Sequence, residues 1–219
     1  MIRNQLQGPR SGPPRGRRSW PPPTPAAMYR RARWELWQAL PRYPDPLVVT
    51  RVQWGATRPE EGYKEQKRLR RVVLHHTSWA AADLIGAGMA AEAACMRAIQ
   101  RNHKARDWID VGYHFVVMPS GRIFLGRPVS AVGAHVAGHN TGSVGVSLAG
   151  DFDVEEPTPA AIRSIDYVLE RLVPGGAGLP LVGHRDLAPT TTCPGAALHP
   201  YVDRHNRALG AAPALAVDA

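Results

Sequence analysis

Short apolar runs rich in β-branched residues alternate with segments of helical composition, and this alternation limits the folds open to the chain. The runs at residues 71–79, 111–118 and 143–148 have the length and composition of buried strands. A turn at 119–121 leads into a further run at 122–126, which predicts a β-hairpin. Helices are predicted at 89–103, 158–173 and 196–209, and a last short strand at 179–183. Strands that alternate with helices predict an α/β fold, with helices on the faces of one sheet.

The composition fits one sizeable folded domain with extensions. The chain has 219 residues, of which 44% are hydrophobic and 21% charged, as is ordinary for a soluble globular protein. It has two cysteines, Cys95 and Cys193, so a disulfide framework does not stabilise it. Cys95 is predicted to lie on the buried face of the helix at 89–103.

The charge is concentrated at the N-terminus. The net charge is +9, which favours an anionic partner: nucleic acid, a membrane surface or an acidic cell-wall polymer. Residues 1–27 are rich in Arg, Pro and Gly, which predicts a disordered arm, either a solvated tail or an anion-seeking segment. No nucleic-acid-binding motif accompanies it.

Further boundaries follow along the chain. Residues 28–46 are predicted to form a short helix and a linker, 47–209 the folded domain, and 210–219 a flexible tail. Neither a signal peptide nor a membrane-spanning segment is recognised.

Residues 182–195 suggest a metal site. His184 and Cys193 lie on either side of a polar run that Pro189 prevents from being a regular helix, so the run can fold back on itself. Imidazole nitrogen and thiolate sulfur are both good zinc ligands, and a third protein ligand is needed. His75 and His76 end a predicted strand and must face opposite sides of the sheet, so one of them can supply it. His75 is the candidate, with water as the fourth ligand of an open, catalytic type of site.

Five motifs then occur in one order along residues 47–205. They are RVQWGA (51–56), HHT (75–77), GYHF (112–115), the long GAHVAGHNTGSVGVSLAGDF (133–152), and GHRD followed by CPG (183–195). In this order they resemble the type 2 N-acetylmuramoyl-L-alanine amidases and the peptidoglycan recognition proteins. The resemblance implies a single domain with a central mixed β-sheet flanked by helices.

The resemblance also implies roles for individual residues. It selects His75 over His76 as a zinc ligand, together with His184 and Cys193. Tyr113 of GYHF would assist at the oxyanion, and the threonine two residues before the cysteine, Thr191, would help in catalysis.

Two departures from the family pattern bear on these roles. Eight residues separate His184 from Cys193, one more than in many relatives, so Thr190 and Thr192 also compete for the role of helper. Some relatives carry a glutamate base where this chain has Ser147.

The function implied is zinc-dependent hydrolysis of the amide between N-acetylmuramic acid and L-alanine in peptidoglycan. Predicted contacts to glycan or stem peptide are His135, Asn140 and Arg185, although Arg185 also suits a structural ion pair. His114 and His139 are predicted to be structural, and Asp186 to orient His184 or Arg185.

The setting implied is that of a phage endolysin or bacterial lysin. We expect a monomer that stays in the host cytoplasm until it is released, with its arm steering it to anionic cell-wall polymer or outer-membrane lipid. The alternative is a receptor that binds peptidoglycan without cutting it. Retention of Tyr113 and Cys193 favours the enzyme.

Overall fold

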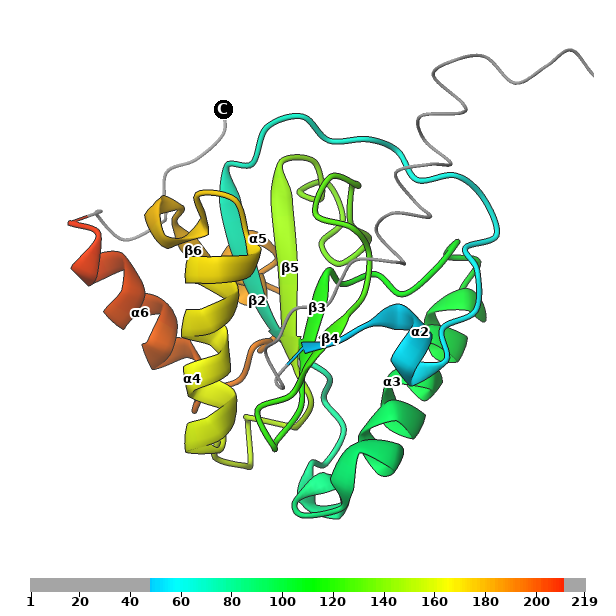
Figure 1. Ribbon diagram of the computed structural model, residues 1–219. Coiled ribbons are helices and arrows are strands. Elements are labelled where there is room, and N and C mark those ends of the chain that lie inside the picture. Colours follow the sequence, from blue (N-terminus) through cyan, green and yellow to red (C-terminus); the bar gives the residue numbers. More distant parts are fainter. Residues whose placement is uncertain (1–47, 211–219) are drawn as a thin grey trace, which may run out of the picture. The chain divides into compact units, whose positions relative to one another are not determined.

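The computed structural model describes residues 48–210 (Figure 1). The predicted arm (1–27), the helix and linker (28–46) and residues 211–219 of the predicted tail lie outside the described residues. None of the described helices combines the length and the apolar composition needed to cross a bilayer.

A six-stranded mixed sheet forms the centre of the described chain, in the order β1-β4-β3-β5-β2-β6. β3 and β4 pair in antiparallel fashion, and the other neighbours are parallel. The strands are β1 (Val48–Val49), β2 (Arg71–His76), β3 (Phe115–Val117), β4 (Ile123–Leu125), β5 (Ser143–Leu148) and β6 (Leu181–Gly183). The predicted α/β fold with a mixed sheet and flanking helices is therefore confirmed.

The helices begin at recognisable capping residues. Thr158 caps α4 by accepting a hydrogen bond from the Ala161 N–H, and Pro159 occupies the first helical position. Thr50 and Gln53 form a capping box at the start of α2. The helices are α2 (Arg51–Trp54), α3 (Gly88–Lys104), α4 (Pro159–Tyr167), α5 (His184–Leu187) and α6 (His199–Ala208), with short turns η1 (Ala82–Leu84), η2 (Val168–Leu172) and η3 (Gly176–Gly178).

One face of the sheet packs against α4 and α6, which lie together in Figure 1. Alternate residues of the strands point to this face, because side chains on a strand alternate between its two sides. β2 contributes Val72 and Leu74, and α4 and α6 contribute Ile165 and Val202. This apolar layer is the larger core of the described domain.

The opposite face is divided between a second core and a polar region. α2 and α3 pack over β1, β3 and β4 through Trp54, Met96 and Phe124. On β5 the residues of this face are Ser143, Gly145 and Ser147, which pair in register with Arg71, Val73 and His75 of β2. Because β5 offers only small side chains here, polar groups of the neighbouring loops can occupy the space above it.

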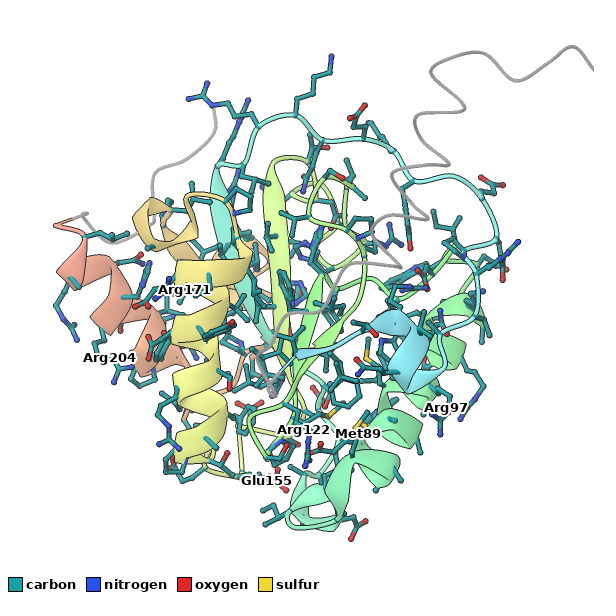
Figure 2. All side chains as sticks on the ribbon, in the orientation of Figure 1. Met89, Arg97, Arg122, Glu155, Arg171 and Arg204 are labelled. Atoms are coloured by element: carbon teal, nitrogen blue, oxygen red, sulfur yellow. The ribbon has the colours of Figure 1, made fainter. Side chains whose placement is uncertain are left out.

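Buried ion pairs connect the second core to its surroundings. Arg51 of α2 lies 2.9 Å from Asp110, and both side chains are fully buried. Asp110 also accepts hydrogen bonds from Tyr63 and Gln100. Arg122, labelled in Figure 2, pairs with the buried Glu92 of α3 at 2.8 Å. These contacts fix α2 and α3 relative to the hairpin β3–β4.

Candidate metal centre

Three potential metal ligands from distant parts of the chain meet beside β2. They are His75 at the end of β2, His184 at the start of α5, and Cys193 in the loop before α6. One ligand atom from each lies within 4.8 Å of those of the other two. His75 Nδ1 is 3.6 Å from Cys193 Sγ, and the rings of His75 and His184 are 4.7 Å apart. The structure thus brings together the three residues that the sequence analysis singled out.

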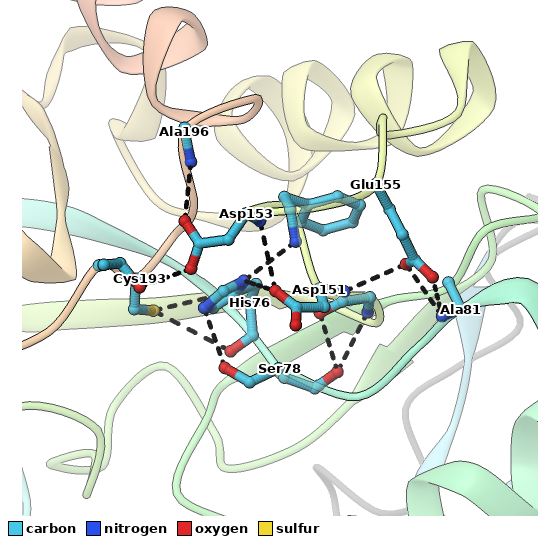
Figure 3. Close-up of polar contacts among 12 residues, drawn as sticks. His76, Ser78, Ala81, Asp151, Asp153, Glu155, Cys193 and Ala196 are labelled. Carbon is cyan, nitrogen blue, oxygen red and sulfur yellow. Dashed lines mark hydrogen bonds and ion pairs between the residues drawn. The ribbon is translucent and has the colours of Figure 1, made fainter.

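Strand alternation separates the two adjacent histidines as predicted. The His75 ring faces His135 and His184, whereas the His76 ring turns toward the segment after β5. There, His76 Nδ1 accepts a hydrogen bond from the Phe152 N–H, and its Nε2 lies 2.9 Å from Ser78 Oγ (Figure 3). The His76 N–H points at Cys193 Sγ from 3.4 Å, so His76 supports the sulfur through its backbone.

A single helical turn directs His184 into the centre. Asp186 caps α5 by accepting from the Gly183 N–H at 2.6 Å and also lies 3.0 Å from His199 Nε2. The Arg185 N–H then donates to the Cys193 carbonyl at 2.7 Å, which closes the loop and brings Cys193 back to His184. The turn ends before Pro189, so the polar run is a loop that starts with one turn of helix.

Burial keeps both histidine ligands neutral near pH 7. It lowers the pKa of His75 well below that of a free imidazole, and the nearby His184 lowers it further. Burial also lowers the pKa of His184. In contrast, burial raises the pKa of the Cys193 thiol to about 12, so a bound cation must displace its proton.

The donor set and its spacing fit zinc. Tetrahedral zinc with ordinary Zn–N and Zn–S bonds places a nitrogen and a sulfur ligand about 3.6 Å apart. The distance from His75 Nδ1 to Cys193 Sγ is 3.6 Å. Imidazole nitrogen and thiolate sulfur are also donors that suit zinc. With three protein ligands, such a site keeps its fourth position for water or substrate.

Tyr113 lies beside His75, with their ring centroids 5.2 Å apart. Burial, and then the negative charge of a Cys193 thiolate, raise the pKa of Tyr113 to about 12. The Tyr113 hydroxyl therefore keeps its proton near pH 7 and can donate a hydrogen bond. Ser147, paired in register with His75, is fully buried; its hydroxyl approaches Tyr113 and is otherwise without a partner among residues 48–210.

The three threonines before Cys193 differ in their surroundings. Thr191 is half-buried and its Oγ1 accepts a hydrogen bond from the Cys193 N–H at 3.2 Å. Thr192 is exposed and donates to Asp153 Oδ2 at 2.5 Å. Thr190 is exposed as well. Of the three, Thr191 has the surroundings expected of a helper at the centre.

The predicted substrate contacts have different degrees of exposure. Arg185 and Asn140 are half-buried, whereas His135 is buried with its ring 5.0 Å from that of His75. Asn140 Oδ1 accepts from the N–H groups of His135 and Val136, so it closes the loop that holds His135. The roles of all three toward substrate stay predictions. His114 is buried between the Gly145 N–H and the Ala131 carbonyl, in keeping with a structural role.

Asp153 was not singled out from the sequence. Its carboxylate accepts from Thr192 and from the Ala196 N–H, and thereby ties the segment after β5 to the Cys193 loop (Figure 3). Asp153 also belongs to a second group of possible metal ligands, together with His76 and Asp151. Its carboxylate, however, already accepts two hydrogen bonds from the Cys193 loop. An acidic residue in a turn gives no sequence signal for such a tether.

Comparisons with known proteins identify the family of the chain. A family model described as N-acetylmuramoyl-L-alanine amidase matches residues 65–196. The N-acetylmuramoyl-L-alanine amidase of Homo sapiens is 38% identical over 160 residues, which are 70% of this chain and 27% of that protein. The endolysin of Klebsiella phage KP32 is 40% identical over 104 residues, covering 45% of this chain and 68% of the endolysin. The chain spans about a quarter of the length of the mammalian relatives.

Solved structures show the same fold. The crystal structure of Drosophila peptidoglycan recognition protein SD superposes with a TM-score of 0.66 at 29% identity, covering 72% of this chain and 93% of that one. Peptidoglycan recognition protein LE, solved in complex with tracheal cytotoxin, gives the same TM-score, identity and coverage. Because the family model matches more than half of its residues, the chain belongs to the N-acetylmuramoyl-L-alanine amidase family.

Proposed function

We propose that this protein is a zinc-dependent amidase that cleaves the bond between N-acetylmuramic acid and the L-alanine of the peptidoglycan stem peptide. The convergence of His75, His184 and Cys193 beside Tyr113 carries this proposal. These three residues would hold a zinc ion, which would supply a Lewis acid to polarise the amide carbonyl and acidify water. Relatives named as amidases and endolysins support the reaction class.

The residues of the chain supply the rest of the site. The Tyr113 hydroxyl would donate a hydrogen bond to the oxygen that gains negative charge as the amide is attacked. Thr191, half-buried and bonded to the Cys193 N–H, is the proposed helper in transferring a proton to the leaving amine. Position 147 is a serine rather than a carboxylate that could act as a base. We therefore assign oxyanion stabilisation to Tyr113 and help in proton transfer to Thr191.

Substrate and setting extend the proposal. Arg185 and Asn140, both half-buried, would contact glycan or stem-peptide groups, and the protein would act on the cell wall as a monomeric phage or bacterial lysin. The likeness to phage endolysins supports this setting. The arginines of residues 1–27 would steer it to anionic cell-wall polymer or outer-membrane lipid. If deletion of residues 1–27 leaves the salt dependence of wall binding unchanged, the steering role is wrong.

Digestion of purified peptidoglycan tests the activity. Released stem peptides with a free L-alanine amino group are measured with untreated, chelator-treated and zinc-restored protein. We expect release that stops with the chelator and returns with zinc. Cys193→Ala should abolish release, while Cys95→Ala, which changes the other cysteine, should not. Wall binding without chelator-sensitive release would support a non-hydrolytic receptor instead.

A further inference from the structure

A second histidine stands directly behind one proposed zinc ligand. His75 Nε2 lies 3.0 Å from His135 Nδ1, on the side of the imidazole opposite to Cys193. Both side chains are buried, with 1% and 7% of their surface exposed. Metal-binding histidines commonly donate a hydrogen bond from their second ring nitrogen to a carboxylate, a carbonyl or water. Here the partner is another imidazole, which can donate or accept according to its tautomer.

Ser143 determines which tautomer His135 adopts. Ser143 Oγ lies 2.9 Å from the carbonyl oxygens of His139 and Asn140 and 3.3 Å from His135 Nε2. Carbonyl oxygens can only accept, so the single hydroxyl proton of Ser143 is directed to them. The lone pair of Ser143 Oγ then faces His135, and His135 Nε2 must carry the proton that it donates.

The tautomer of His135 determines the position of the ring proton of His75. With its proton on Nε2, His135 presents a bare lone pair at Nδ1. His75 must then donate from Nε2 to that lone pair, which leaves His75 Nδ1 without a proton and facing Cys193. We infer that His135 is a positioning residue, which holds His75 in the tautomer and orientation that a metal requires of it.

The protonation states agree with this sequence of donors. Burial lowers the pKa of both His75 and His135 well below that of a free imidazole. Each ring is therefore neutral near pH 7 and carries one ring proton. Its neighbours determine which of the two ring nitrogens holds that proton.

The surrounding chain makes room for the His135 ring. A Cβ atom on Gly133 would lie 2.4 Å from His135 Cδ2, and one on Gly145 would lie 2.6 Å from the same atom. Both distances are far below van der Waals contact, so the ring occupies space that two glycines leave empty. Asn140 anchors the backbone N–H of His135 from the same loop.

This inference rests on the proposed zinc site, and zinc affinity tests it without reference to activity. His135→Leu removes the acceptor and should weaken zinc binding about 10–100-fold, the usual cost of losing such a partner. His135→Asn places an amide oxygen near the former Nδ1 and should restore much of the affinity. His139→Leu makes the same chemical change in the same loop, at a half-buried side chain, and should leave affinity near that of the wild type.

Competition with a chromophoric chelator gives the affinities, and circular dichroism checks that each variant is folded. If His135→Leu folds and binds zinc as tightly as the wild type, the inference is wrong while the zinc site stands. If the wild type itself binds no zinc, the proposed function fails instead.

The tautomers can be read directly in zinc-free protein. Long-range proton–nitrogen spectra distinguish protonated from bare imidazole nitrogens, and we expect protons on Nε2 of both His75 and His135. Ser143→Ala should mix the two tautomers of His135, because the acceptor at its Nε2 is gone. A proton on Nδ1 of His75 in the wild type would overturn the inference even if zinc binds.

Discussion

Tyr113 is the residue whose single hydroxyl has the clearest chemical task. Its raised pKa, about 12, keeps it a donor over the whole neutral range. We expect Tyr113→Phe to lower kcat about 10²–10³-fold, the usual cost of losing one oxyanion donor, with little change in zinc affinity. Tyr201→Phe is the matched control, since that hydroxyl binds Asp166 beside α6. Equal kcat in the Tyr113 variant and the wild type would rule out the assigned role.

Thr191 and Thr192 allow a sharp comparison between neighbours. Thr191 is half-buried next to Cys193, whereas Thr192 is exposed and bound to Asp153. Thr191→Val should lower kcat by about tenfold or more, because a polar contact in the transition state is lost. Thr192→Val should leave kcat nearly unchanged. The reverse order, measured on soluble muropeptides, would assign the helper to Thr192.

The buried pair of Arg51 and Asp110 shows how α2 is held on the domain. Asp110→Ala removes a buried carboxylate that pairs with Arg51 and accepts hydrogen bonds from Tyr63 and Gln100, and it should lower the free energy of unfolding by about 3–5 kcal/mol. Lys104 and the exposed Glu60 form a contrasting pair at 4.0 Å, and Glu60→Gln should change stability by about 0.5 kcal/mol or less. Urea unfolding measures both, and similar losses would contradict the distinction.

At the scale of elements, the presence of strands and helices was easier to predict than the residues at which they end. β5 spans Ser143–Leu148 as expected, because β-branched residues there follow a glycine and precede a small-residue turn. β3 is shorter than predicted, since Tyr113 and His114 bond outside the regular ladder, with Arg127, Gly126 and Gly145. The helix predicted at 158–173 is α-helical only to Tyr167 and continues as a π-helical turn. Apolar spacing does not distinguish these two kinds of turn.

The candidate site was predictable where a period or a motif marks it. Strand alternation places His75 and His76 on opposite faces, and the proposed metal ligands follow from the resemblance of the motifs. The approach of His135 to His75 was not predictable, because residues 131–142 form a loop without a period. Cys95 is half-buried at the edge of the second core rather than at its centre.

At the scale of the whole molecule, buried histidines predict sensitivity to acid. Burial lowers the pKa of His103 and of His114 to about 4. Between pH 6.5 and pH 4 these two histidines are protonated in the unfolded chain but largely neutral in the folded chain. The free energy of unfolding therefore falls as the pH falls through this range. When zinc-free protein unfolds near pH 5, these two histidines alone should take up about two protons from the solvent. Thermal midpoints that do not change between pH 7 and pH 4.5 would contradict this.

The three proposed ligands also determine when during synthesis the centre can exist. His75 and Cys193 are 118 residues apart, and His184 and Cys193 both come after the last strand of the sheet. A ribosome that has made most of the sheet has therefore produced only one of the three ligands. Domains generally fold as units, so a domain that still lacks its last segment is not complete. A nascent or prematurely ended chain that lacks the Cys193 loop cannot assemble the centre, so the proposed activity requires the finished domain.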